Sequence, residues 1–168
     1  MRIQVRGISG SGKTTVAAEA ARRLGAPHIE LDALHWGRNW TQASAEELRS
    51  RVAPLLQGER WVVDGSYSAK LGSLVADRVD TVVWLDPPLR VALTRLFHRT
   101  RGRIGSREEL WAGNRETWRG AVLGRESLFV WAVRSWLRQR RSIPATVPPE
   151  KLVRLRSDEE TQGWLGTL

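Results

Sequence analysis

A glycine-rich stretch near the start of the chain, residues 7–15, has the residue types and spacing of a phosphate-binding loop. It reads Gly-Ile-Ser-Gly-Ser-Gly-Lys-Thr-Thr and fits the pattern G-x-x-x-x-G-K-[ST]. Glycines allow successive backbone N–H groups to point inward, where they bind phosphate oxygens together with the N-terminus of the following helix. Lys13 adds a positive charge near the β- and γ-phosphates, and the Thr14 hydroxyl is a magnesium ligand. The predicted nucleotide-binding residues of the loop are Gly7, Ser9, Gly10, Ser11, Gly12, Lys13, Thr14 and Thr15.

The segments on either side of this loop are those that the motif requires. Residues 3–5 alternate apolar and polar side chains, as a short strand does. Residues 16–24 are rich in helix formers and are followed by Gly25. A strand, a glycine loop and a helix N-terminus in this order predict binding of a nucleotide together with Mg²⁺.

Three further apolar runs each end in an aspartate and alternate with helical segments. The runs are residues 27–31, 61–63 and 79–85, and the aspartates are Asp32, Asp64 and Asp86. Strands that alternate with helices predict a parallel sheet with helices on both faces, and ligands bind at the carboxyl ends of such strands. We therefore expect the three aspartates near the phosphate-binding loop, with Asp64 and Asp86 as competing candidates for the metal.

The remaining elements follow from caps and helix formers. Ser44 and Glu47 form a capping-box pattern for a helix that runs to about Gln57, in which Pro54 is expected to introduce a kink. Residues 102–124 contain five glycines and are predicted to form a lid. Further helices are expected at residues 68–76, 89–101, 126–139 and 157–168, a linker at 144–149 and a last strand at 152–155.

The positive charge of the chain is concentrated in one segment. The net charge is +9, and residues 95–141, with twelve arginines and four glutamates, carry +8 of it. An excess this local indicates a segment that handles anions, either the phosphates of a nucleotide or nucleic acid. Arg95 and Arg99 are four residues apart, so we expect both to point to the same side of their helix.

Length and composition indicate one soluble domain. A chain of 168 residues is expected to form a single domain with its own core. The sequence has no cysteine, which excludes disulfides and thiolate metal sites. No apolar run approaches the roughly 20 residues that span a bilayer, and the chain begins directly with a strand, so we expect a cytoplasmic protein without a signal peptide. We expect a monomer or a weak homodimer.

Five stretches together resemble the P-loop kinases related to adenylate kinase. More narrowly, they resemble the bacterial group labelled adenylate-kinase-related or "DNA topology modulation" proteins. The stretches read GISGSGKTT, HIELDALHW, WVVDGSYS, TVVWLDPP and LVRLRS, and they span nearly the whole chain. The resemblance implies a three-layer α/β/α fold with a five-stranded parallel sheet in the order 2-3-1-4-5. It also implies an arginine-rich helical lid at about residues 100–142.

The resemblance also implies roles for individual residues. Thr14 and Asp64 would hold the metal, which favours Asp64 over Asp86, and Asp86 would be structural. Asp32 would position the acceptor or accept a hydroxyl proton, although it also fits a cap for residues 33–36. Of Arg95 and Arg99, one would pack on the base and the other would reach phosphate, and Arg99 and Arg103 would act on the transferred group. For any single arginine of this segment a solvated basic face is the alternative.

The sequence therefore predicts an Mg²⁺- and ATP-dependent phosphotransferase that acts on a small acceptor. The turn Gly65-Ser-Tyr67 lacks the arginine that clamps an acceptor phosphate in nucleoside monophosphate kinases, which favours an unphosphorylated acceptor. Trp36, Trp40 and Tyr67 are candidates for stacking on an aromatic acceptor. The alternative is an ATP-binding regulatory module that binds nucleic acid through the basic segment, and a third hypothesis is a plain ATPase.

Overall fold

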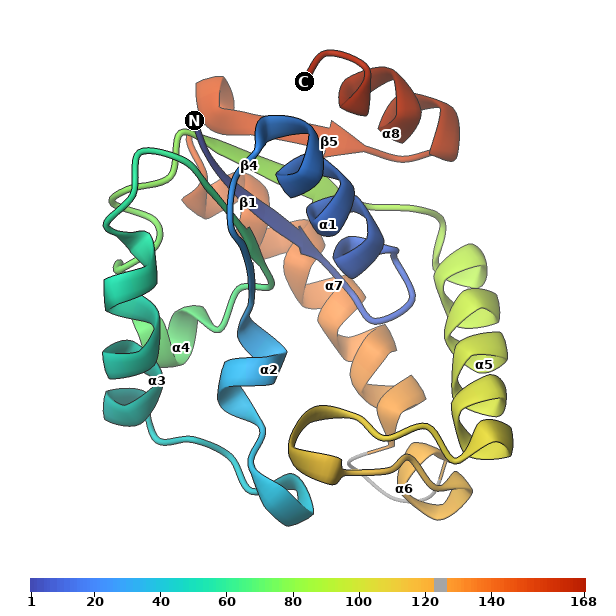
Figure 1. The fold of residues 1–168 in the computed structure, drawn as a ribbon. Helices are drawn as coiled ribbons and strands as arrows, with labels where there is room; N and C mark the ends of the chain where they lie inside the picture. The colour runs from blue at the N-terminus through green and yellow to red at the C-terminus, as the bar shows by residue number, and fades with distance from the viewer. Residues whose placement is uncertain (123–126) are drawn as a thin grey trace.

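The computed structural model describes residues 1–122 and 127–168 and contains one parallel sheet of five strands (Figure 1). The strand order is β2-β3-β1-β4-β5, as predicted. The strands are β1 (Arg2–Gly7), β2 (His28–Glu30), β3 (Trp61–Asp64), β4 (Thr81–Leu85) and β5 (Leu152–Leu155). All pairs in this order are parallel, so the carboxyl ends of the strands share one edge.

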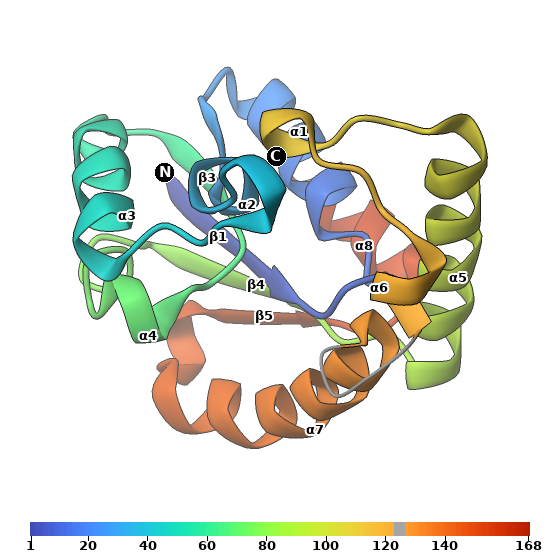
Figure 2. The same ribbon diagram turned by 90° about the horizontal axis from the view of Figure 1, so that it is seen from below.

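Helices cover both faces of the sheet (Figures 1 and 2). On one face α1 (Lys13–Leu24) and α8 (Asp158–Leu165) pack over Ile3, Val5 and Val83. On the other face α3 (Ala45–Val52), α4 (Ser68–Leu71) and α7 (Leu128–Thr146) contribute to a core built around Trp61 and Trp84. The remaining helices are α2 (Leu31–His35), α5 (Leu89–Ser106) and α6 (Trp118–Val122).

The sequence patterns explain these layers. All four residues of β3 are buried, which is expected for a central parallel strand with both faces covered. The capping box is confirmed, because Ser44 Oγ accepts from the Glu47 amide at 3.1 Å and Glu47 Oε2 accepts from the Ser44 amide at 2.7 Å. The helix changes to a 3-10 turn at residues 53–56, which include Pro54.

Several predicted boundaries are wrong. The second strand ends at Glu30, and Leu31 already begins α2, so Asp32 lies in the first turn of a helix and does not cap residues 33–36. Helix α5 continues to Ser106 into the segment predicted as lid, since the glycines at 102 and 105 are tolerated there. Helix α7 includes Pro144 near its end, where a proline disturbs few further hydrogen bonds.

The segment predicted as a lid therefore divides into different parts. The end of α5, the short 3-10 turn at Trp111–Gly113 and α6 lie beyond the sheet edge where the strands end (Figures 1 and 2). The second half of α7 belongs to the layer over the sheet, and its Ile143 is part of the core. Glu126, where the sequence places the start of this helix, lies outside the described residues.

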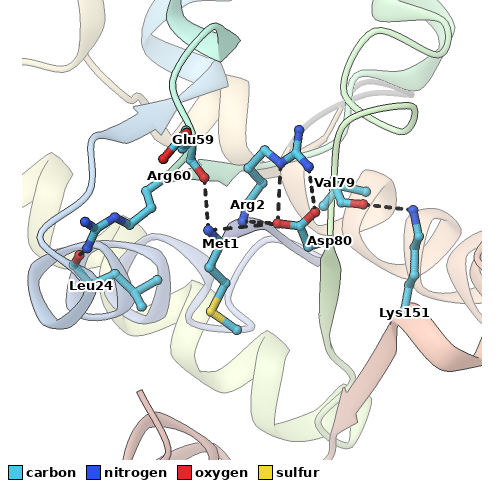
Figure 3. Close-up of polar contacts among 8 residues, drawn as sticks. All are labelled: Met1, Arg2, Leu24, Glu59, Arg60, Val79, Asp80 and Lys151. Atoms are coloured by element: carbon cyan, nitrogen blue, oxygen red, sulfur yellow. Dashed lines mark hydrogen bonds and ion pairs between the residues drawn. The ribbon is translucent and has the colours of Figure 1, made fainter.

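Polar contacts close the opposite edge, where the strands begin (Figure 3). Arg2 donates through Nη2 to Asp80 Oδ1 at 2.9 Å, and the Met1 ammonium donates to the carbonyl of Glu59 at 2.9 Å. Lys151 Nζ donates to the carbonyl of Val79 at 3.0 Å and joins the start of β5 to the segment before β4. These contacts fix the strand starts.

None of the described helices is both long and apolar enough to span a membrane.

Candidate active site

The phosphate-binding loop joins β1 to the N-terminus of α1, and two of its glycines are required by geometry. Gly12, which caps α1, has φ 93°, and Gly10 has φ 83°, both in the left-handed region that favours glycine. A Cβ on Gly10 would also clash with the backbone carbonyl of Ala92 in α5. The loop is therefore shaped by its glycines and held against α5.

Thr14 and Asp64 are in direct contact beside this loop. Thr14 Oγ1 donates to Asp64 Oδ2 at 2.6 Å, although the two residues are 50 positions apart. Asp64 is buried, and its Oδ1 has no hydrogen-bond partner among the described residues. Burial raises the pKa of Asp64, and the Lys13 charge partly offsets this. Lys13 Nζ itself donates to the carbonyl of Ile8 at 3.3 Å, so its side chain folds back over the loop.

These residues fit Mg²⁺ bound together with a nucleotide. In the described part of the chain no three His, Asp or Glu side chains gather as a metal site. Magnesium is usually held by one or two protein oxygens plus substrate phosphates and water. A hydroxyl beside a carboxylate with one unsatisfied oxygen supplies that donor set.

A second group of residues lies around Asp32. Tyr67 Oη donates to Asp32 Oδ1 at 2.6 Å, and burial followed by the Asp32 charge raises the pKa of Tyr67, so the phenol stays protonated. The buried His35 ring lies 4.5 Å from the Tyr67 ring and 4.8 Å from Trp36, and Trp36 lies 5.5 Å from Trp40. The structure thus brings together the aspartate and the aromatic residues that the sequence places near an acceptor.

Glu30 is a site residue that the sequence analysis missed. It ends β2 and pairs in register with Asp64 on β3. Burial raises its pKa, the Trp111 side chain opposes this shift, and the charges of Asp64 and Asp32 add to it. Its signal is its position in the second apolar run, but that run predicts a strand that continues to Leu31, which favours Asp32.

Asn114 connects the 3-10 turn at Trp111–Gly113 to the segment that follows α2. Its side chain is 6% exposed; Nδ2 donates to the carbonyl of Gly37 at 2.8 Å, and Oδ1 accepts from the amide of Trp40 at 3.0 Å. Nδ2 also donates to the carbonyl of Trp111 at 2.7 Å. One amide group therefore satisfies three backbone groups from two segments more than 70 residues apart.

The three predicted arginines of α5 lie in different surroundings. Arg95 forms an ion pair with Asp158 of α8 at 2.6 Å. Desolvation lowers the pKa of Arg99 and the charge of Arg103 lowers it further, while the charges of Glu116 and Asp32 act in the opposite direction. Arg103 pairs with Glu116 at 3.2 Å and with Glu108 at 3.5 Å. The Asp32 charge therefore acts on the Arg99 guanidinium.

The carboxylate of Asp86 forms ion pairs with two arginines from other elements. Its carboxylate accepts from Arg154 of β5, and Arg140 Nη2 of α7 lies 3.2 Å from its Oδ2. The carboxylate is 1% exposed. Since both of its oxygens are engaged, Asp86 has the surroundings of a structural residue, whereas Asp64 keeps a free oxygen beside the phosphate-binding loop.

Solved structures of several kinases share this fold over nearly the whole chain. A gluconokinase of Sinorhizobium meliloti is 21% identical, with a TM-score of 0.57 and coverage of 99% of this chain and 91% of that one. A shikimate kinase of Bacteroides thetaiotaomicron is 15% identical, with a TM-score of 0.59 and coverage of 99% and 95%. A deoxyadenosine kinase of M. mycoides is 11% identical, with a TM-score of 0.57 and coverage of 99% and 98%. The chain has the P-loop kinase fold.

Two curated proteins are similar in sequence over part of the chain. The uncharacterized protein YqaC of Bacillus subtilis is 30% identical over 113 residues, which cover 66% of this chain and 62% of that protein. A shikimate kinase of Salinibacter ruber is 45% identical over 58 residues, which cover 33% of this chain and 28% of the kinase. The chain thus spans less than two thirds of these relatives, and no family model matches it. The narrower resemblance to the "DNA topology modulation" group stays a prediction.

Proposed function

We propose that this protein is an Mg²⁺- and ATP-dependent phosphotransferase that transfers the γ-phosphoryl group to a hydroxyl of a small acceptor. The observation that carries the proposal is the Thr14–Asp64 contact, with its unsatisfied buried carboxylate oxygen, at the same sheet edge as the Tyr67–Asp32 hydrogen bond. The Thr14–Asp64 pair suits a metal-bound nucleotide, and the Asp32–Tyr67 pair suits a hydroxyl group. The kinases that share the fold act on acceptors of this kind.

On the donor side, the loop amides and Lys13 hold the β- and γ-phosphates. Thr14 and Asp64 would hold Mg²⁺, which neutralises phosphate charge when bound. The predicted nucleotide role of Arg95 requires that its ion pair with Asp158 opens.

On the acceptor side, Asp32 accepts the proton of the attacking hydroxyl. Tyr67, which stays protonated, orients that carboxylate through its hydrogen bond. Arg99 faces the negative charge that develops on the transferred group. Arg103 faces the same charge when its ion pairs with Glu108 and Glu116 open.

A second candidate function is nucleic-acid binding, and one surface favours it. Arg134, Arg138 and Arg141 line a shallow depression on the exposed side of α7 together with Leu137 and Ser142. Non-specific binding there would weaken steeply with salt. Negligible affinity for duplex DNA at low salt would exclude this function.

The experiment that tests the kinase proposal is ADP release from Mg·ATP across a panel of nucleosides, nucleotides, sugars and sugar acids. We expect one acceptor class to stimulate turnover, and Lys13→Ala to abolish the stimulated rate. ADP release that is the same with and without every acceptor would indicate a plain ATPase.

A further inference from the structure

Three residues form a row across the sheet on the face that α7 covers. Arg6 of β1 pairs in register with Trp84 of β4, and Trp84 pairs with Arg154 of β5. Arg154 lies over the Trp84 ring, with its guanidinium carbon 4.3 Å from the ring centre, and it forms an ion pair with Asp86, which Arg140 shares. The row therefore holds two guanidinium groups, of which one has a carboxylate partner.

Arg6 lacks such a partner among the residues that the structure describes. Its only hydrogen bond there runs from Nε to the neutral amide oxygen of Gln4 at 2.8 Å. A guanidinium has five N–H donors, so most of its capacity is unused. Arg6 is partly buried, and this burial lowers its pKa. An incompletely paired, desolvated cation costs stability, and such groups cluster at functional sites.

The position of Arg6 places it on the acceptor side of the site. Ile3 and Val5 point to the α1 face, so the alternation of β1 sends Gln4 and Arg6 to the opposite face. Gln4 Nε2 donates to the carbonyl of Gly65 at 2.8 Å, and the turn from Gly65 leads to Tyr67.

Tyr67 packs against the core of that same face. Arg6 and the Asp32–Tyr67 pair thus share one face and one edge of the sheet.

We propose that Arg6 binds an anionic group of the phosphoryl acceptor, a carboxylate or a phosphate monoester, while Asp32 receives the hydroxyl that is phosphorylated. The inference rests on the proposed function and defines its substrate class. A carboxylate would agree with the expectation of an unphosphorylated acceptor and a phosphate monoester would replace it. In either case β1 supplies the cation that the Gly65-Ser-Tyr67 turn lacks. Arginine suits both anions, since its planar fork binds two oxygens at once.

The test uses acceptors in pairs that share a skeleton and differ in charge: gluconate and sorbitol, shikimate and its methyl ester, AMP and adenosine. kcat/KM for acceptor-dependent ADP release is measured for the wild type, Arg6→Met and Arg60→Met. Arg60 is the matched control, because its described hydrogen bond also goes to one neutral oxygen, the Leu24 carbonyl, at the far edge of the sheet (Figure 3). The melting temperature of each variant is measured without acceptor, and Arg154→Met is added.

We expect the wild type to favour the charged member of one pair by about 10- to 100-fold, the contribution of a hydrogen-bonded ion pair. Arg6→Met should erase this preference and Arg60→Met should keep it. A preference within the gluconate or shikimate pair would identify a carboxylate as the bound anion, and a preference for AMP over adenosine would identify a phosphate. Arg6→Met should melt no lower than the wild type, since it replaces a desolvated charge with an apolar chain of similar length, whereas Arg154→Met should melt lower.

Charge preference that persists in Arg6→Met, absence of any preference in the wild type, or a lower melting temperature of Arg6→Met would each overturn the inference. The melting temperatures report on Arg6 whether or not transfer occurs. Failure of the kinase proposal, which would appear as no transfer to any acceptor, is therefore distinguishable from failure of this inference.

Discussion

At the scale of single residues, the site depends on carboxylates held in different states of solvation. Asp64 is buried between Thr14 and the loop, whereas the carboxylate of Asp32 keeps partial contact with solvent and one hydrogen bond from Tyr67. Burial that costs stability in the free protein prepares a carboxylate for a cation. Substitutions of Asp64 or Asp32 are therefore expected to lower activity without lowering the stability of the fold.

Asp64→Asn should lower phosphotransfer by about 10- to 100-fold, the usual cost of disturbing the support of a metal. It should also raise the melting temperature at pH 7. Burial raises the pKa of Asp64 in the folded state, so the native protein binds this proton more tightly than the unfolded chain does. Ionised Asp64 therefore lowers the stability of the fold. This loss is absent below the pKa that Asp64 has in the unfolded chain, and it appears as the pH rises through the pKa that Asp64 has in the folded protein.

The measurement is therefore thermal unfolding of both proteins against pH. The advantage of Asp64→Asn should disappear as the pH falls through the raised pKa toward the ordinary value. A variant that is less stable than the wild type at every pH would contradict the desolvation argument.

Tyr67→Phe should lower kcat/KM for the acceptor by about tenfold, because one hydrogen bond to a charged group is lost. The ring contact with His35 remains, and the loop that binds nucleotide is untouched. The affinity for ATP, measured by titration, should therefore be unchanged. An equal loss of ATP affinity would show that Tyr67 supports the whole site and not Asp32 alone.

At the scale of elements, backbone strain gathers after α2, before α4 and in the turn at Trp111–Gly113. Asn39, Trp40, Tyr67 and Ala112 all have φ between 44° and 57°, although none is a glycine. Strained residues of this kind persist where their surroundings hold them. Asn114 is the side chain that holds two of these segments together.

Asn114→Ala should lower the free energy of unfolding by about 1–3 kcal/mol, because buried backbone groups lose their partner. The acceptor KM should rise, while ATP affinity stays unchanged. The neighbouring Arg115→Ala is the control, since its ion pair with Glu109 is exposed and should contribute below about 1 kcal/mol. Denaturant unfolding and acceptor kinetics of both variants check this, and equal effects of the two would contradict the role of Asn114.

The sequence predicted the parts of this site that depend on neighbours in the chain. The phosphate-binding loop and the Ser44–Glu47 cap are local patterns, and the sheet order came from resemblance. The contact of Asn114 with Gly37 joins residues 77 positions apart, and Asp86 pairs with Arg140 and Arg154, which lie 54 and 68 positions away. Such contacts arise from tertiary packing, which no local spacing encodes.

At the scale of the whole molecule, Asp86 joins elements that are distant in the sequence. It directly follows β4, while Arg140 comes from α7 and Arg154 from β5. Asp86→Ala should lower the free energy of unfolding by about 1–3 kcal/mol, below the usual cost of a buried pair because both guanidinium groups keep solvent contact. Urea unfolding of Asp86→Ala and Asp64→Ala checks this, and a smaller loss for Asp86→Ala would favour Asp86 over Asp64 as the metal residue.

The measurement that tests the central claim most directly follows the γ-phosphoryl group itself. Protein, Mg²⁺ and ATP labelled in the γ-phosphate are incubated with the acceptor that stimulates ADP release, and the label is assigned to acceptor or to inorganic phosphate. We expect the wild type to place the label on the acceptor and Asp32→Asn to lose this product while it still binds ATP. Label found only in inorganic phosphate, in equal amount for both proteins, would contradict the account.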